Sequence, residues 1–263
     1  MITSMKDAFS LKGKNALITG GNRGIGKGIA IAMAQCGANI AIMARNEETA
    51  KKTLAELAEY GGEHRFYKGS VEKLDEATAV VNAVMKDYGK IDVLVNNSGI
   101  FRWFNVLDMD PTDLRDWYEV IDVNLNGVFI MSMLVAQKMK ETGGGSIINI
   151  SSNAANIVNI PQNTSSYSSA KAAVNHLTRC LAYEFGPHKI RVNAICPGFV
   201  EAESPPEDEE MKKIVEMWIS RCPTGRFTYP LEIGALAVFL ASEASENMTG
   251  SINTIDSGYE LAR

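Results

Sequence analysis

The sequence predicts an α/β protein built on a parallel β-sheet with helices covering both faces. Short β-branched apolar runs recur along the whole chain, and segments with helical patterning fill the gaps between them. Parallel strands are buried on both faces, so they appear in a sequence as near-continuous apolar runs. The chain has 263 residues, of which 46% are hydrophobic and 22% charged, and this fits a single domain over residues 1–263.

The strand candidates are short apolar runs, each bounded by polar or turn residues. They are Asn15–Thr19, Asn39–Met43, His64–Tyr67, Asp92–Val95, Ser146–Ile150, Ile190–Cys196 and Ser251–Ile255. The helix candidates between them show helical patterning, and the second is rich in Ala, Glu and Lys. They are Ile25–Gln35, Glu47–Tyr60, Leu74–Tyr88, Pro111–Met139, Ser166–Phe185 and Pro230–Ala241. Nothing in the alternation looks like a linker or a repeat.

One stretch breaks this rhythm. Glu201–Glu210 contains two prolines and six acidic residues, and a helical stretch that carries Trp218 follows it. Long irregular segments in α/β enzymes often close over a site, so residues 201–222 are predicted to form a substrate lid. A solvated loop that leads into an amphipathic helix is the alternative.

The charge balance limits the partners. A net charge of −5 and a pI near 5.4 argue against a nucleic-acid or anionic-membrane binder and leave a small-molecule substrate. The first residues show no basic region followed by an apolar run, so no secretory signal is predicted. The longest apolar runs, such as Val128–Val135, are too short to cross a bilayer. We therefore expect a cytoplasmic protein.

The cysteines and histidines suggest neither disulfides nor a metal. The four cysteines are scattered through apolar stretches, so we expect buried thiols in a reducing compartment. The histidines form no cluster with the spacing of metal ligands, and no metal site is predicted. These residues are Cys36, Cys180, Cys196, Cys222, His64, His176 and His188.

A glycine-rich turn follows the first strand and opens the first helix. In Thr19-Gly-Gly-Asn-Arg-Gly-Ile-Gly26, glycines at 20, 24 and 26 let the backbone turn sharply and approach a pyrophosphate at the helix N-terminus. Asn22, Arg23 and Ile25 complete this dinucleotide-binding candidate. A phosphate-loop interpretation fails, because Gly28 stands where the magnesium-binding hydroxyl is required.

The end of the second strand predicts the cofactor preference. NAD sites of this architecture place an acid there to hold the ribose 2′-hydroxyl. Here the strand ends in Ala44 followed by Arg45. Arg45 and Arg23 can clamp a 2′-phosphate, since guanidinium matches phosphate oxygens bidentately. The sequence therefore favours NADP(H) over NAD(H), with two solvated surface arginines as the alternative.

Tyr167 and Lys171 form a candidate proton-transfer pair. They stand four residues apart, so both side chains project from one face of a helix. A phenol has a pKa of about 10, too high for a base near neutrality. An ammonium about 4 Å away favours the phenolate by roughly 4 kcal/mol at an effective dielectric of about 20. We therefore expect Lys171 to lower the pKa of Tyr167 by about three units.

From here the chain resembles the short-chain dehydrogenase/reductase family, over about Leu11 to Tyr259. The resemblance rests on ordered motifs, which are Thr19-Gly-x-x-x-Gly-Ile-Gly26, Asn96-Asn-Ser-Gly99, Asn124, Ser152 with Tyr167-x-x-x-Lys171, and Pro197-Gly198. It implies a Rossmann-type, doubly wound sheet of seven strands. It further implies a homotetramer or homodimer that transfers a hydride between a nicotinamide cofactor and a secondary alcohol or ketone.

The resemblance also implies roles for single residues. Tyr167 is the general acid/base, and Lys171 lowers its pKa and binds the nicotinamide ribose. Ser152 holds the substrate oxygen, with its neighbour Ser151 as the other candidate. Asn124 holds a proton-relay water, or satisfies backbone groups at a helix kink.

Further residues are expected along the cofactor. By the same resemblance they are Val71, Asn97, Gly99, Pro197 and Val200. By that resemblance, Ser70 puts the hold on the adenine ring in doubt, and Ala202 puts one hydrogen bond to the carboxamide in doubt. The chain departs from the family pattern at four places. These are Ser98 in place of alanine, Ser70 in place of an aspartate after the third strand, Ala202 in place of a threonine, and Asp256-Ser-Gly258 in place of Asp-Gly-Gly.

The substrate is the least determined feature. Amides at Asn153, Asn156, Asn159 and Gln162 suit the hydroxyls of a polyol, sugar or sugar acid, and this loop resembles that of family members acting on such substrates. The alternative is that these amides satisfy the backbone groups of their own loop.

Aromatic residues near the expected mouth favour a different substrate, a flat steroid or bile-acid ketone. They are Phe101, Trp103 and Phe104, joined by Trp218 from the predicted lid. A 3-oxoacyl reductase and a non-enzymatic dinucleotide sensor are the remaining alternatives.

Overall fold

Seven strands form one parallel sheet. The computed structural model describes residues 4–201 and 207–261. The strand order is β3-β2-β1-β4-β5-β6-β7, and every neighbouring pair is parallel, which confirms the predicted fold class. Each strand begins and ends within one residue of its predicted bounds. The strands are β1 (Asn15–Thr19), β2 (Asn39–Ala44), β3 (His64–Lys68), β4 (Val93–Asn96), β5 (Gly145–Ile150), β6 (Ile190–Pro197) and β7 (Ile252–Ile255).

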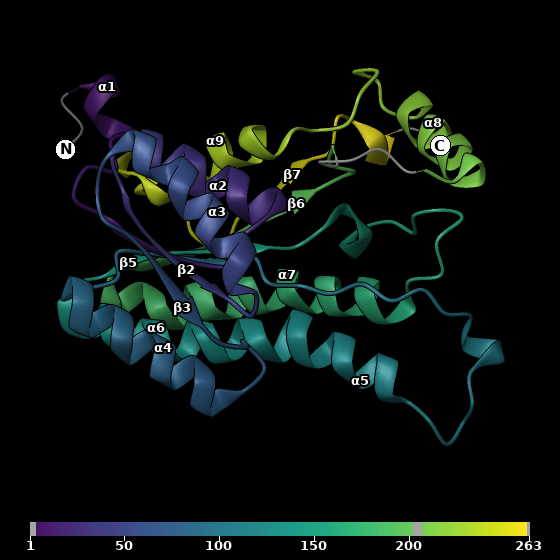
Figure 1. Ribbon diagram of the computed structural model, residues 1–263, viewed down its shortest axis with the longest axis horizontal. Coiled ribbons are helices and arrows are strands. Elements are labelled where there is room, and N and C mark those ends of the chain that lie inside the picture. Colours follow the sequence, from purple (N-terminus) through teal and green to yellow (C-terminus); the bar gives the residue numbers. More distant parts are fainter. Residues whose placement is uncertain (1–3, 202–206, 262–263) are drawn as a thin grey trace.

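Helices cover both faces of the sheet (Figure 1). One face carries α2 (Gly24–Gln35), α3 (Glu47–Leu57) and α9 (Pro230–Ala241). The other carries α4 (Leu74–Tyr88), α6 (Gly127–Thr142) and α7 (Ser165–Phe185). The remaining α-helices of the described residues are α1 (Met5–Ala8), α5 (Arg115–Ile121) and α8 (Glu209–Ser220).

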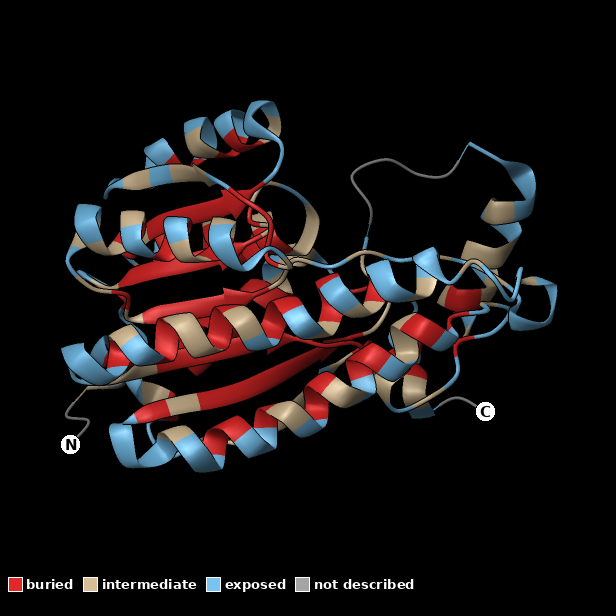
Figure 2. Cartoon of the chain, turned by 90° about the horizontal axis from the view of Figure 1, so that it is seen from below, coloured by how far each residue is buried: buried red, intermediate tan, exposed pale blue. Residues whose placement is uncertain are grey.

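The sheet separates two hydrophobic clusters. On β1, Leu17 packs into the cluster that contains residues of α4 and α6, whereas its neighbour Ile18 packs into the cluster with α2 and α9. Successive side chains of a strand point to opposite faces, so a strand covered on both sides is apolar throughout. Figure 2 shows the resulting band of buried strands inside the shell of helices.

The helix predicted over Pro111–Met139 starts later and is interrupted. The structure has α5, then a π-helical turn at Asp122–Asn126, and then α6. Before α5, Asp110 accepts hydrogen bonds from the backbone N–H and the hydroxyl of Thr112, at 2.8 and 2.7 Å. Such side-chain bonds to the local backbone compete with helix formation, so the helix begins only at Arg115.

The helical run from Arg115 to Thr142, which includes the π-helical turn, is long and apolar enough to cross a bilayer by its length and composition alone. It has 28 residues and a mean hydropathy of 1.5 over its most apolar window, which extends well beyond Val128–Val135. Half of that window is buried inside the molecule, and α6 packs against β4, β5, α4 and α7. The apolar composition of this run is therefore explained by its place in the core.

The four cysteines are free thiols, but they are not all buried. Cys196 and Cys222 are buried and Cys36 is half-buried. Cys180 is exposed on the solvent side of α7, so the prediction of a buried thiol is wrong there. A short apolar stretch in an amphipathic helix does not show which way a single side chain faces.

The segment predicted as a lid leaves and rejoins the body of the protein at one place. Glu201 donates its backbone N–H to the Thr228 carbonyl at 2.9 Å, and Thr228 donates its N–H to the Phe199 carbonyl at 3.1 Å. Residues 202–206, including Ala202, lie outside the described residues. The described part ends in α8, which stands beyond the carboxyl ends of β6 and β7 (Figure 1).

Trp218 anchors α8 in an aromatic cluster. Its ring stacks on Phe199 with centroids 4.2 Å apart, and Phe199 also contacts Phe227 and Tyr259. The indole N–H donates to the carbonyl of Ile160 at 2.8 Å. Trp218 is only 6% exposed, so its first role is to dock the helix.

We predict that Gly234→Ala lowers the free energy of unfolding by about 1–3 kcal/mol, the usual cost of overpacking. A methyl group at Gly234 would lie 2.6 Å from the Cβ of Ala32 and 2.7 Å from the Gly28 carbonyl oxygen, where α9 crosses α2. Urea denaturation measures the change. Gly186→Ala is the control, since nothing lies within 4 Å of its added methyl group. Equal stabilities of the two variants would contradict this account of the crossing.

Candidate active site

The glycine turn is shaped by close backbone contacts. After β1, Gly20 and Gly24 adopt φ values of +65° and +53°, a region that favours glycine. A Cβ at Gly26 would lie 2.2 Å from the Gly20 carbonyl oxygen and 2.4 Å from Asn97 Nδ2, so no side chain fits there. The turn therefore brings the N-terminus of α2 directly over the end of β1, as a bound pyrophosphate requires.

Asn97 and Thr19 tie this turn to β4. The Thr19 hydroxyl accepts hydrogen bonds from the backbone N–H groups of Asn97 and Ser98, at 2.9 and 3.0 Å. Asn97 Nδ2 donates to the carbonyls of Thr19 and Gly20, at 3.0 and 3.1 Å. Asn97 was predicted to line the cofactor path, and it also acts as a brace for the turn. Thr19 was not singled out as a functional residue from the sequence.

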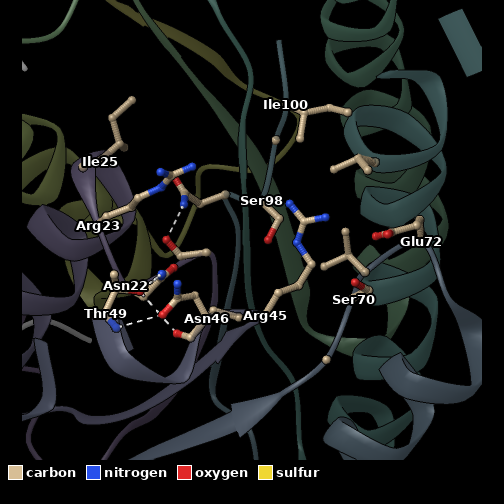
Figure 3. A pocket seen from close by; sticks show the side chains of 18 residues that line it. Asn22, Arg23, Ile25, Arg45, Asn46, Thr49, Ser70, Glu72, Ser98 and Ile100 are labelled. Atoms are coloured by element: carbon tan, nitrogen blue, oxygen red, sulfur yellow. Dashed lines mark hydrogen bonds between the residues drawn. The ribbon is translucent and has the colours of Figure 1, made fainter. Parts of the chain in front are cut away.

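A pocket of about 600 Å³ opens beside the turn (Figure 3). The predicted cofactor residues that line it come from the glycine turn and from the ends of β2, β3 and β4. They are Gly20, Asn22, Arg23, Gly24, Ile25, Arg45, Val71, Asn97 and Gly99. Gly26 lies just behind them.

Two lining residues that sequence reasoning missed are Asn46 and Thr49, at the start of α3. Asn46 caps this helix by accepting from the Thr49 N–H at 3.0 Å, and Asn22 Nδ2 donates to the Thr49 hydroxyl at 2.6 Å. An asparagine three residues before a threonine at a helix start is the signal that would have identified the pair.

The arginines at this pocket have no carboxylate partner among the described residues. Arg45 and Arg23 are exposed, and neither takes part in an ion pair or a side-chain hydrogen bond there. Figure 3 shows the Arg45 side chain reaching into the pocket between Ser98 and Ser70. Glu72 is the single carboxylate among the lining residues, and Ala44 ends β2 without one.

A second pocket, of about 220 Å³, continues from the first. The two pockets share Ile25, Asn97, Gly99 and Ile100, so they form one continuous cleft at the carboxyl edge of the sheet. The second pocket brings together all four predicted catalytic residues. Asn124 comes from the π-helical turn, Ser152 follows β5, and Tyr167 and Lys171 lie on α7.

Lys171 is buried without a counter-ion in this pocket. Its Nζ donates to the Ile150 carbonyl at 2.8 Å and lies 5.6 Å from the centre of the Tyr167 ring. Burial lowers the pKa of Lys171 to about 8. Burial also raises the pKa of Tyr167, against the opposing effect of a hydrogen bond with Ser152. The expected lowering of the Tyr167 pKa is therefore not found, because desolvation outweighs the hydrogen bond with Ser152.

The two candidate serines face different partners. The Ser151 hydroxyl donates to the backbone carbonyl of Lys171 at 3.1 Å and so fastens α7 to the end of β5. The Ser152 hydroxyl accepts from the Ala154 N–H at 3.1 Å, and its hydrogen bond acts on the pKa of Tyr167. This arrangement favours Ser152 as the residue that meets the substrate oxygen.

Asn124 combines both roles considered for it. Its Nδ2 donates to the carbonyls of Ile100 and Val120, at 2.8 and 2.9 Å, and thereby satisfies backbone groups around the π-helical turn. Its Oδ1 is buried and has no hydrogen-bond partner in the part of the chain that the structure describes. A Cβ at Gly99 would lie 2.7 Å from this oxygen and 3.8 Å from Lys171 Nζ. The free acceptor therefore faces the same small space as the ammonium.

Comparison with known proteins identifies the family of the chain. A family model described as enoyl-(acyl carrier protein) reductase matches residues 20–260. A solved short-chain type dehydrogenase/reductase from Mycobacterium marinum superposes with a TM-score of 0.91 at 38% identity, covering 97% of this chain and 99% of that one. The chain belongs to the short-chain dehydrogenase/reductase family. It is therefore an oxidoreductase that uses a nicotinamide dinucleotide and acts on small alcohols or ketones.

Two further proteins of this family are similar over nearly their whole length. Sorbose reductase SOU1 of Candida albicans is 37% identical over 98% of this chain and 90% of its own. A solved gluconate 5-dehydrogenase from Burkholderia cenocepacia J2315, in complex with NADP and tartrate, has a TM-score of 0.89. It is 32% identical, and the match covers 99% of this chain and 100% of that one.

Of the other predicted site residues of this short-chain dehydrogenase/reductase, some line the cleft and some do not. Pro197 lines the second pocket together with Gly198. Val200 lines neither pocket; it pairs with Thr228 and packs against the core. Gln162 also lines neither pocket, and nor does Trp103, which is 47% exposed.

Two predicted substrate residues are buried away from the cleft. Trp218 is held in its aromatic cluster, and Asn153 is 2% exposed and bonded to Asn159. Phe101, by contrast, does line the pocket and meets Tyr167 edge to face at 5.1 Å.

We predict that Lys171→Met abolishes turnover but stabilises the ligand-free enzyme by about 1–3 kcal/mol at pH 7, since a buried charge is removed. Below pH 8 the lysine is charged in both the folded and unfolded states, so the whole gain is present. Between pH 8 and 10.5 the folded wild type loses its proton first and recovers stability, so the gain shrinks. Urea denaturation at pH 7 and pH 9.5 measures both effects.

The control is Lys86→Met on the exposed side of α4, which should change stability by less than about 0.5 kcal/mol. A Lys171→Met protein that is less stable than wild type at pH 7 would show that the burial of this ammonium carries no net cost.

Proposed function

We propose that this short-chain dehydrogenase/reductase uses NADP(H) to interconvert a secondary alcohol and a ketone on a polyol, sugar or sugar acid. The observation that carries the proposal is the continuous cleft. At one end Asn124, Ser152, Tyr167 and Lys171 converge, and at the other Arg45 stands without a carboxylate partner among the described residues.

The residues of the larger pocket fit the pyrophosphate and the 2′-phosphate of NADP(H). Gly20, Gly24 and Gly26 let the backbone approach the pyrophosphate at the N-terminus of α2. Arg45 and Arg23 suit the 2′-phosphate, and the end of β2 lacks the acid that would repel it. The similar gluconate 5-dehydrogenase in complex with NADP supports the same choice.

The smaller pocket holds the groups for proton transfer. The bound cofactor supplies or accepts the hydride. Ser152 donates a hydrogen bond to the substrate oxygen and stabilises the charge that develops there. Tyr167 gives or takes the proton of that oxygen. Lys171 holds positive charge beside the phenol, and the free Oδ1 of Asn124 accepts a water that links Lys171 to solvent.

The size of the smaller pocket favours a small substrate. At about 220 Å³ it lies below the roughly 300–1,000 Å³ typical of sites for drug-sized ligands. Sorbose reductase and gluconate 5-dehydrogenase, two similar proteins, are named for a sugar and a sugar acid. Phe101 at the mouth of the pocket suits a flat apolar ketone, because its ring contacts Tyr167 edge to face.

The assembly and cellular place are part of the same proposal. We expect a homotetramer or homodimer in the cytoplasm, as the family resemblance implies. Tyr118, Phe129 and Tyr183, which lie on α5, α6 and α7, are each about half exposed or more, which suits a surface covered by another copy.

We predict that the enzyme oxidises NADPH with L-sorbose or 5-keto-D-gluconate and that Tyr167→Phe lowers kcat by at least about 100-fold, the usual share of general acid catalysis. NADPH absorbance follows turnover, and cofactor fluorescence shows that binding survives. Tyr60→Phe, after α3, is the control, since that ring is 40% exposed and lines neither pocket. Turnover of a 7-oxo bile acid alone would replace the sugar assignment. Tight NADPH binding without turnover of any ketone would favour a sensor.

We predict that Arg45→Asp lowers the ratio of kcat/KM for NADPH over NADH by about 10–100-fold, the worth of one charge-assisted bond to the 2′-phosphate. Initial rates at fixed ketone measure the ratio. Arg179→Asp makes the same charge change at an exposed position near the opposite end of α7 and should leave the ratio unchanged. An unaltered ratio in Arg45→Asp means that Arg45 does not read the phosphate.

A further inference from the structure

Two buried asparagine amides lie behind Ser152. Asn153 and Asn159 are 2% and 5% exposed, and Asn159 Nδ2 donates to Asn153 Oδ1 at 3.1 Å. The same Oδ1 lies 3.4 Å from the Ser152 hydroxyl oxygen and accepts its hydrogen. The oxygen of Asn153 therefore competes with acceptors in the pocket, Tyr167 and the substrate oxygen, for the only hydrogen that Ser152 can donate.

Nothing else among the described residues fixes which way these amides point. The other two polar atoms of the pair, Asn153 Nδ2 and Asn159 Oδ1, are buried and have no hydrogen-bond partner. If both amides turn by 180°, nitrogen and oxygen exchange places, and the 3.1 Å contact remains an N–H···O bond with donor and acceptor reversed. To a first approximation the two orientations make the same number of hydrogen bonds within the pair.

The two amide orientations differ in where they direct the hydroxyl hydrogen of Ser152. With its oxygen towards Ser152, Asn153 draws the hydroxyl hydrogen away from the pocket. With its nitrogen towards Ser152, Asn153 donates to the hydroxyl oxygen, which also accepts from the Ala154 N–H at 3.1 Å. Both lone pairs of the hydroxyl are then occupied, and its hydrogen is left for an acceptor in the pocket.

We propose that Asn153 and Asn159 form a positioning pair that directs the Ser152 hydroxyl hydrogen to the substrate oxygen when their amides turn together. The inference rests on the oxidoreductase chemistry at Ser152 and not on the sugar assignment. It gives the buried Asn153 a role behind the serine in place of direct substrate contact. A donor aimed at the developing oxyanion is worth about 10²–10³ in kcat, so its direction matters.

Two aspartate substitutions each favour one of the two orientations of the Asn153 and Asn159 amides. In Asn159→Asp, the carboxylate can only accept, so Asn153 must present its nitrogen and Ser152 is released towards the substrate. In Asn153→Asp, the carboxylate can only accept, so it captures the hydrogen of Ser152. Protonation reverses each effect, because a carboxylic acid can donate. Burial raises the pKa of such a carboxyl group and brings this switch towards the working pH range.

The test is the rate of hydride transfer from NADPH to 2,3-butanedione in a single turnover between pH 5 and 9. The small diketone makes the readout independent of the sugar assignment. We expect a new ionisation in each variant with opposite sign: the rate rises with pH in Asn159→Asp and falls with pH in Asn153→Asp, by tenfold or more. The ionisable groups around this loop are Tyr167 and Lys171 on α7, Cys196 on β6 and Glu260, and both variants keep them.

Asn163→Asp adds the same charge at an exposed position of the same loop and should keep the wild-type profile. Profiles that are unchanged in both variants, or that shift in the same direction, overturn the proposal, since a merely structural pair changes the rate without opposite slopes. If Asn153→Asp does not fold, Asn159→Asp decides: a rate that rises with pH beyond the wild-type profile supports the proposal, and a wild-type profile rejects it.

Discussion

The join between β1 and β4 is the constraint on which the rest of the site depends. The sheet order reverses there, because β2 and β3 extend to one side of β1 while β4 to β7 extend to the other. Crossover helices leave in opposite directions, and a crevice opens between them. Thr19 and Asn97 close the base of that crevice with hydrogen bonds from both strands. The glycine turn lies at one end of the resulting cleft, and Ser152 and α7 lie at the other.

Burial, rather than the closeness of the two groups, determines how the pKa values of Tyr167 and Lys171 shift in the cleft. Tyr167 and Lys171 stand one helical turn apart, yet removal from water raises the phenol pKa and lowers that of the ammonium. Among the described residues, the buried Lys171 ammonium has no counter-ion and Asn124 Oδ1 has no hydrogen-bond partner, and both face the same small space. These unsatisfied groups cost stability, and they suit an enzyme whose cofactor and substrate complete the site.

The strands and the ordered motifs could be predicted because their causes are local. A strand buried on both faces must be apolar throughout, and Gly26 leaves no room for a side chain. The π-helical turn at Asp122–Asn126 could not be predicted, since it changes the helical hydrogen bonding without altering the apolar pattern. The packing of Trp218 on Phe199 and the exposure of Cys180 depend on distant partners. The pairing of Asn153 with Asn159 likewise appears only once the loop is folded.

The backbone hydrogen bond between Glu201 and Thr228 holds the two ends of the segment that contains α8 together at one point of the sheet. The chain departs from the sheet edge and returns to the same point, so the segment can lengthen, shorten or change composition at a small entropic cost. The α8 segment and the parallel sheet are thereby separable stretches of sequence. Evolution, or an engineer exchanging this segment between relatives, can therefore change it without rebuilding the parallel strands.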